Sequence, residues 1–250
     1  KPNTIAISMN LLTFKSGIHP AYKKNSTEAS AICAAKIPKK VIIPLQQHIG
    51  APNKPLVKKG ELVKTGQKIA DNEAFVSSPV HASISGKVKA VAPSLHPSGQ
   101  LTTSITIQSD EKDELFESNP EKREYADLSP DEIRRISKGA GIVGLGGAAF
   151  LTHVKLSPPK DKKIDAVILN GAECEPYLTA DHRLMLEQPE KVVYGLKAVM
   201  KSLNVSKGYI GIENNKKDAI KAILDIAGKN GVDIEVHGLQ VKYPQGAEKM

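Results

Sequence analysis

The chain has 250 residues, of which 40% are hydrophobic and 25% are charged, and its formal net charge is +8 at pH 7. This composition is that of an ordinary globular protein, long enough for about two modest domains. Its two cysteines, Cys33 and Cys174, exclude a disulfide framework, a four-cysteine zinc site and an iron–sulfur cluster made by these residues alone. Aromatic residues make up only 4%, which argues against a base-stacking surface for nucleic acid. No apolar run approaches the roughly 20 residues of a membrane span.

The first half of the chain divides into an arm, a β domain and a linker. Residues 1–40 show no sustained hydrophobic period, so we expect an N-terminal arm wrapped on a neighbouring domain, with residues 1–8 as a possible extension. Residues 41–109 contain short β-rich runs separated by Gly and Pro, which predicts a small all-β sandwich or barrel. Residues 110–128 are charged and poor in apolar side chains, as expected of a linker.

The second half, residues 129–250, alternates predicted helices and strands. Ser129–Glu132 (SPDE) is a capping box with Pro at the first helical position, and it predicts a helix that ends near Lys138. The other predicted elements are, in chain order, a strand at 165–170, a helix at 189–203, a strand at 208–213, a helix at 216–229 and a strand at 232–241. This alternation predicts an open, mostly parallel α/β sheet.

The stretch Gly139–Lys155 reads GAGIVGLGGAAFLTHVK. Dense glycines leave backbone N–H groups uncovered, and a helix that begins just afterwards directs its positive end at an anion. The stretch therefore predicts a phosphate or nucleotide site. Its first three glycines have the spacing G-x-G-x-x-G, but the preceding segment is predicted to be a helix rather than a strand, which disfavours a Rossmann loop.

A second candidate segment follows the strand at 165–170. In open α/β sheets ligands bind beyond the carboxyl ends of the strands, where Asn170 leads into GAECEPY. Asn170 can donate and accept hydrogen bonds, which suits an amide-bearing ring, and Glu173 and Glu175 can accept them from a ring N–H or a ribose hydroxyl. The alternative is a polar turn whose side chains satisfy local backbone groups. The seven histidines show no metal-site spacing, and none is placed by sequence to activate Cys174.

The β domain resembles the biotinyl/lipoyl-type barrel-sandwich hybrid. The resemblance lies in two stretches, VKKGELVKTGQKI (57–69) and SPVHASISGKV (78–88). A swinging-arm carrier of that type needs a lysine at the hairpin between its halves, and residues 70–74 (ADNEA) contain none. A rigid docking module is therefore favoured over a carrier.

A wider resemblance covers nearly the whole chain from Met9. GLGGAAFLTHVKL (144–156), followed by ILNGAECEPYLTADHRLMLEQP (168–189), resembles the FMN-binding fold of the flavoprotein subunit of respiratory complex I. The chain is still more similar to the C subunit of the Rnf ion-translocating ferredoxin:NAD oxidoreductase complex, which TFKSGIHP (13–20) and YPQGAEK (243–249) also resemble. The resemblance implies a barrel-sandwich hybrid domain followed by an FMN-binding α/β domain that is incomplete at its C-terminus.

The resemblance implies cofactor-binding roles in the glycine stretch. Gly144, Gly146 and Gly147 would bring backbone amides to the flavin. Lys155 would add positive charge near the FMN phosphate or the reduced ring, and Phe150 would face the nicotinamide nucleotide. An exposed helical lysine and a core aromatic residue are the alternative interpretations of these two. The family pattern G-G-A-G-F-P is altered here, because Ala149 replaces a glycine and Leu151 a proline.

The resemblance also implies roles for the second segment and for the C-terminal one. Asn170 and Glu173 would hydrogen-bond the isoalloxazine edge, whereas Glu175 would face the nicotinamide nucleotide. The residues that match a further flavin and NADH segment are Tyr243, Gly246 and Glu248.

The function implied by the resemblance is electron transfer. The full-length protein would exchange hydride between NAD(H) and FMN, and would pass electrons to two [4Fe–4S] clusters in a C-terminal region absent here. The cofactor carries this chemistry, so no catalytic acid or base is expected, and no metal site is expected in this chain. The expected partners are other subunits of an Rnf-type complex, at the cytoplasmic face of the cell membrane, with no nucleic acid and no membrane span of its own. The alternative is a non-catalytic docking or scaffold subunit with a degenerate nucleotide-binding fold.

Overall fold

The computed structural model describes residues 11–117, 123–145, 149–228 and 233–250. The chain forms two compact units. One, here called the β-rich unit, is Ala35–Lys162, and the other, the α/β unit, combines the residues up to Ala34 with Lys163–Met250. These limits differ from the boundaries expected from the sequence at 40/41 and 128/129, which stay predictions. Within the described residues, no helix is both long and apolar enough to cross a membrane.

The β-rich unit contains two antiparallel sheets. One has the strand order β1-β7-β6-β3 and the other β2-β4-β5. The strands are β1 (Lys40–Pro44), β2 (Lys54–Pro55), β3 (Leu62–Val63), β4 (Lys68–Asp71), β5 (Val80–His81), β6 (Gly86–Leu95) and β7 (Leu101–Ser109). Side chains of both sheets, among them Ile69, Val88 and Ile107, share one hydrophobic core. This arrangement confirms the predicted barrel-sandwich fold.

Two helices belong to the same unit and are tied to the β-rich part. The α1 helix (Pro130–Gly139) begins with the predicted capping box, in which Ser129 and Glu132 bind each other's backbone N–H groups. Lys138 Nζ donates to the Ala74 carbonyl at 3.0 Å. In the short α2 helix (Thr152–Lys155), His153 Nε2 donates to the Phe75 carbonyl at 2.8 Å. These bonds fix both ends of the glycine stretch against the segment between β4 and β5. A short 3-10 helix, η2 (Tyr125–Asp127), precedes α1.

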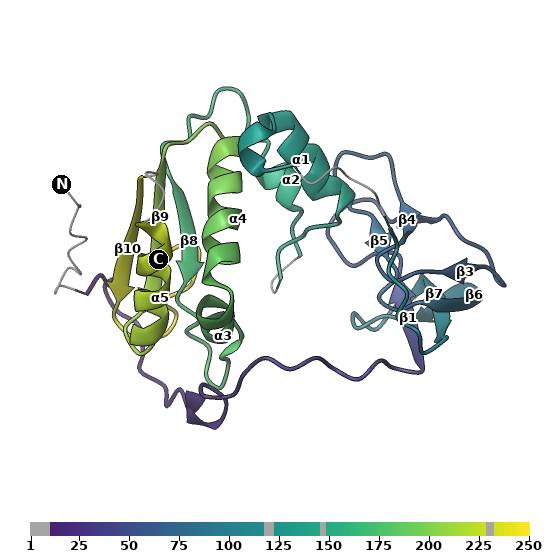
Figure 1. The fold of residues 1–250 in the computed structure, drawn as a ribbon, viewed down its shortest axis with the longest axis horizontal. Coiled ribbons are helices and arrows are strands. Elements are labelled where there is room, and N and C mark those ends of the chain that lie inside the picture. The colour runs from purple at the N-terminus through teal and green to yellow at the C-terminus, as the bar shows by residue number, and fades with distance from the viewer. Residues whose placement is uncertain (1–10, 118–122, 146–148, 229–232) are drawn as a thin grey trace. The chain divides into compact units, whose positions relative to one another are not determined.

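The α/β unit is built on a three-stranded parallel sheet with the order β10-β9-β8 (Figure 1). Its elements are β8 (Val167–Gly171), α3 (Ala180–Glu187), α4 (Pro189–Ser202), β9 (Lys207–Glu213), α5 (Lys217–Ala227) and β10 (Asp233–Leu239). The periodic apolar residues of α4 and α5, such as Val193, Leu196 and Ile223, pack against Ile210 and Ile212 of β9. The parallel α/β fold is thus as predicted, whereas α3 had not been predicted as a separate helix.

The N-terminal arm runs along the α/β unit. Leu12 pairs in parallel with Leu239, at the outer side of β10, and Ile18 pairs with Tyr243. A short 3-10 helix follows, η1 (Lys24–Ser26). After it, Arg183 of α3 binds the Glu28 carbonyl at 3.1 Å, and the Ile32 N–H donates to Glu187 at 2.9 Å. The arm is therefore held by hydrogen bonds along much of its length.

Candidate functional site

The carboxyl end of β8 joins two segments that lie far apart in the sequence. Asn170, near the end of β8, donates from Nδ2 to the Gly246 carbonyl at 2.7 Å, and its Oδ1 accepts from the Ala172 N–H at 3.2 Å. A Cβ added at Gly246 would lie 3.4 Å from Ala172 Cβ and from both polar atoms of the Asn170 amide. The absence of a side chain at Gly246 therefore leaves the Asn170 amide uncovered on that side.

The same two segments meet again at Glu175. The Tyr243 hydroxyl donates to Glu175 Oε1 at 3.1 Å, and this hydrogen bond raises the pKa of Tyr243 above its ordinary value. The Gly246 N–H also points to Cys174 Sγ, at 3.4 Å. Four of the site residues predicted for this unit, Asn170, Glu175, Tyr243 and Gly246, thus lie together at one end of the sheet. Glu248 is exposed near the C-terminal end.

Glu173 has a structural task that the sequence did not predict. Its Oε1 accepts from the Asp181 N–H at 2.6 Å, and its Oε2 accepts from the His182 N–H at 3.2 Å. The N-cap residue of α3, Thr179, makes no side-chain cap, so Glu173 satisfies the first free N–H groups of that helix instead. Burial, and then the nearby Glu173 carboxylate, raise the pKa of Asp181. A hydrogen bond from a ligand to Glu173 would have to use the lone pairs that remain.

Behind this turn lies a cavity of ≈ 260 Å³. It is lined by His19, Pro20, Tyr22, Cys174, Glu213, Val241 and Lys242. Glu213 and Lys216 are fully buried and lie 3.3 Å apart. Burial raises the pKa of the Glu213 carboxyl and lowers the pKa of the Lys216 ammonium. Lys216 Nζ also donates to the Ala172 carbonyl at 2.7 Å, so a member of this ion pair is hydrogen-bonded to the backbone of the turn.

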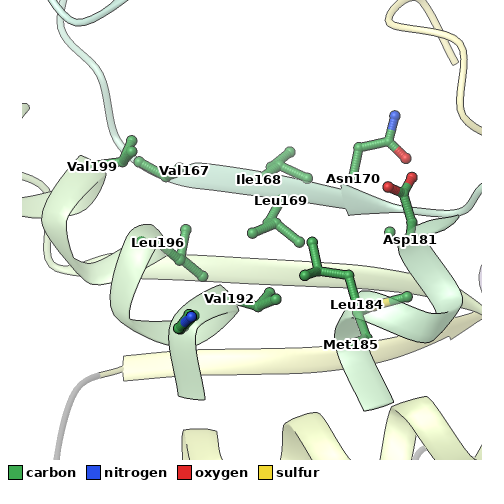
Figure 2. Close-up of a pocket in the computed structure, with 13 residues that line it drawn as sticks. Val167, Ile168, Leu169, Asn170, Asp181, Leu184, Met185, Val192, Leu196 and Val199 are labelled. Atoms are coloured by element: carbon green, nitrogen blue, oxygen red, sulfur yellow. The ribbon is translucent and has the colours of Figure 1, made fainter. Parts of the chain in front are cut away.

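A groove of ≈ 460 Å³ runs along β8, whose outer edge pairs with no strand among the described residues. Its walls are mostly apolar side chains of β8, α3 and α4, such as Leu169, Leu184 and Leu196. Figure 2 shows the carboxamide of Asn170 and the carboxylate of Asp181 near each other at the end of the groove where β8 leads into the turn. The polar groups are thus concentrated at the carboxyl end of the strand.

The glycine stretch belongs to the β-rich unit. Val143 and Leu151 form an antiparallel bridge, and the Gly144 N–H donates to the Phe150 carbonyl at 2.8 Å, which closes the base of a loop. Lys155 Nζ lies 5.9 Å from the centre of the Phe150 ring and 3.7 Å from the place of a Cβ added at Gly144. The Lys155 ammonium therefore faces the base of this loop, where an anion could be held.

Backbone conformation explains two other positions of this stretch. Ala149 has a φ of +48°, a left-handed conformation that favours the glycine of the family pattern. Gly141 has a φ of +72°, and a Cβ there would lie 2.8 Å from the Pro79 carbonyl, so this glycine is needed for packing on the strands. Two further predicted site residues, Gly146 and Gly147, lie outside the described residues.

Sequence reasoning missed the buried pair Glu213 and Lys216. The chain contains 35 lysines and arginines, so a single lysine gives no signal of burial. The helix start at Ala180 could have been noticed, because Asp181 stands in its first turn.

Two family models match the chain. Residues 12–112 match the RnfC barrel sandwich hybrid domain, and residues 137–250 match the Nuo51 FMN-binding domain. The chain is 54% identical over 237 residues to the C subunit of the Na(+)-translocating ferredoxin:NAD(+) oxidoreductase complex of Acetobacterium woodii, covering 95% of this chain and 53% of the relative. It is 52% identical over 240 residues to the C subunit of the proton-translocating complex of Clostridium ljungdahlii, covering 96% of this chain and 52% of the relative.

A more distant relative is the C subunit of the ion-translocating oxidoreductase complex of Rhodobacter capsulatus, with 38% identity over 98% of this chain and 48% of the relative. The chain thus spans about half the length of these curated relatives. The two domain matches follow one another in the same order as the predicted domains. The chain belongs to the RnfC family, the C subunits of the Rnf-type ion-translocating ferredoxin:NAD(+) oxidoreductase complexes.

Proposed function

We propose that the full-length protein exchanges hydride between NAD(H) and FMN and passes the electrons singly to iron–sulfur clusters. It would do so as a peripheral subunit on the cytoplasmic face of a membrane-bound complex. The match to an FMN-binding domain supports the cofactor, and the relatives' names, which describe a ferredoxin:NAD(+) oxidoreductase complex, support the redox reaction. FMN, when bound, supplies the conversion between two-electron and one-electron transfer.

The observation that carries this proposal is the meeting of two distant segments at the carboxyl end of β8. Asn170 binds Gly246, and Glu175 binds Tyr243, although about 70 residues separate the partners in the chain. The sequence resemblance assigns each segment separately to the flavin and nicotinamide site. That edge of a parallel sheet is also where open α/β folds bind nucleotides.

The side chains in this part of the α/β unit are suited to orienting planar, amide-bearing rings. Asn170 uses one Nδ2 hydrogen on Gly246 and keeps its second for a ring carbonyl. Glu175 accepts from Tyr243 through one oxygen, which leaves the other for the carboxamide of the nicotinamide. Such contacts hold reacting rings in register, which is the main contribution a protein makes to hydride transfer.

In the β-rich unit, the donor set is suited to an anion. Lys155 provides a cation next to Gly144, with its Nζ 3.7 Å from the place of a Cβ added there, and an ammonium in this position can pair with a phosphate. We assign Lys155 to the FMN phosphate or to the negative charge of the reduced flavin. The two [4Fe–4S] clusters would be bound outside these 250 residues, which contain only Cys33 and Cys174.

The test is an anaerobic titration of the full-length protein with FMN, followed by NADH. We expect flavin fluorescence to be quenched on binding, and the bound flavin absorbance to be bleached by NADH. Lys155→Met should weaken FMN binding about tenfold, as expected for the loss of one charge-assisted contact. Lys160→Met, at an exposed lysine five residues later, is the matched control.

Each result has a clear meaning. A full-length protein that shows no flavin absorbance and leaves FMN fluorescence unchanged would refute the proposal and would favour a docking or scaffold role. Equal weakening by Lys155→Met and Lys160→Met would refute the specific assignment of Lys155, because general surface charge would then explain the effect.

A further inference from the structure

Lys24 of the N-terminal arm lies directly beneath the Glu173–Leu178 segment of the site. Only 2% of its surface is exposed. Its Nζ donates to the backbone carbonyls of Glu173 at 2.9 Å, Glu175 at 3.0 Å and Leu178 at 2.5 Å. In Figure 1 the arm passes, in purple, beside the loop that leads into α3. A single buried ammonium group thus donates hydrogen bonds to three carbonyl groups of one turn.

The turn needs such a support because its backbone is unusual. Glu173 has a φ of +49° and Tyr177 a φ of +67°, and both are residues with side chains in the left-handed region. The turn belongs to no strand or helix that could satisfy its carbonyl groups. A second hydrogen bond joins the turn to the arm: the Tyr177 N–H donates to the Tyr22 carbonyl of the arm at 2.8 Å.

We propose that Lys24 is a positioning residue for the flavin and nicotinamide site, and this rests on the function proposed above. Its three N–H groups match three carbonyl oxygens, so one side chain fixes the path of the backbone on both sides of Glu175. The position of Glu175, and its bond to Tyr243, follow from that path. The arm thereby completes the site with a residue about 150 positions before it.

A lysine is better suited to this position than an apolar residue of equal length. Methionine would fill the same space but would remove the donor of all three carbonyl groups, and the turn would then relax towards other conformations. A ligand that binds only the correct conformation loses affinity in proportion to the fraction of molecules that adopt it. If that fraction falls to about one in ten, the Kd for FMN rises about tenfold.

The experiment compares three variants of the full-length protein. Lys24→Met removes the ammonium, Arg183→Met loosens the arm at Glu28 without touching the turn carbonyls, and Lys15→Met changes an exposed lysine of the same arm. For each variant, the Kd for FMN is measured by fluorescence quenching. Amide hydrogen exchange of residues 173–178 is measured with and without saturating FMN.

We expect Lys24→Met to raise the Kd about tenfold and to speed exchange at 173–178, with wild-type exchange restored at saturating FMN. That restoration is the linkage effect expected if FMN binds only the correct conformation of the turn, and the comparison with Arg183→Met separates it from a general loosening of the arm. Lys15→Met should behave as the wild type. An unchanged Kd in Lys24→Met refutes the proposal, and so does an equal rise in Arg183→Met, because attachment of the arm would then be the cause. If the wild type binds no FMN, the proposed function fails instead, and exchange without FMN still decides whether Lys24 holds the turn.

Discussion

The buried pair Glu213 and Lys216 provides the sharpest test of how the turn is supported. Replacing Lys216 with Met leaves a fully buried carboxylate without its cation and removes the donor to the Ala172 carbonyl. Breaking a buried ion pair in this way costs about 3–5 kcal/mol. In the double variant Lys216→Met/Glu213→Gln neither position of the pair is charged, so we expect only the cost of the unpaired carbonyl, about 1–3 kcal/mol. Lys221→Met, at an exposed lysine of α5, is the control.

The sign of the pH dependence follows from the carboxyl group. Burial raises the pKa of Glu213 above its usual 4.5, and loss of the Lys216 charge raises this pKa further. A raised pKa in the folded state means that stability is fully present below the unfolded pKa and is lost as pH rises through the folded pKa. The deficit of Lys216→Met should therefore be smaller at pH 5 than at pH 7, whereas the double variant should show no such change.

The assay is amide hydrogen exchange of Ile210 and Ile212 in β9, which reports the unfolding free energy of the α/β unit. Both residues are fully buried in its core. Thermal melts at pH 5 and pH 7 give the pH dependence. A loss below about 1 kcal/mol in Lys216→Met would show that the pair is not effectively buried. A double variant no more stable than the single one would show that the unpaired Glu213 charge is not the cause.

Three further predictions concern single groups. Ala149→Gly relieves a left-handed φ of +48° and should stabilise the β-rich unit by about 1–2 kcal/mol in thermal melts, whereas unchanged stability would mean that the loop is not strained. In the capping box, hydrogen bonds from the Ser129 backbone N–H, then from the Ser129 hydroxyl and from Arg123, lower the pKa of Glu132 to about 2, which an NMR titration should show. In Ser129→Ala the loss of the hydroxyl contact should move this pKa part of the way back towards 4.5, and an unchanged pKa would contradict the contact. Glu175→Gln removes the carboxylate that raises the pKa of Tyr243, so tyrosinate absorbance should appear at lower pH; an unchanged titration would argue against their hydrogen bond.

Local patterns predicted much of the fold because they act through neighbouring residues. The spacing of Val193, Leu196 and Met200 indicated a helix that the structure confirms as α4, and the SPDE sequence indicated the capped start of α1. The parallel sheet followed from the alternation of strands and helices. Each helix signal is complete within about 15 residues, and the alternation needs only the order of such segments, so a single sequence contains the necessary information.

The rest depended on contacts between distant parts of the chain. Sequence spacing could place Glu173 near the end of a strand. It could not show that both carboxylate oxygens of Glu173 accept hydrogen bonds from N–H groups at the N-terminus of α3. The path of the arm also has no local signal, because it depends on backbone pairs with residues more than 200 positions away, such as that of Leu12 with Leu239. Only the resemblance, which compares whole segments, linked Asn170 with Gly246 in advance of the structure.

Three of the buried lysines, Lys24, Lys216 and Lys242, place part of the chain's positive charge inside the protein rather than on its surface. Lys24 and Lys216 hold carbonyl groups of the turn, and Lys242 donates to the Phe14 and Ser16 carbonyls of the arm. Each ammonium serves mainly as a donor to the backbone, so these charges are not available to a polyanionic partner. A strained turn beyond a strand is costly to build from backbone bonds alone. Lys24 of the arm and Lys216 of the β9–α5 loop supply donors to this turn, and Lys242, after β10, holds the arm, so distant parts of the chain together fix the conformation of the turn.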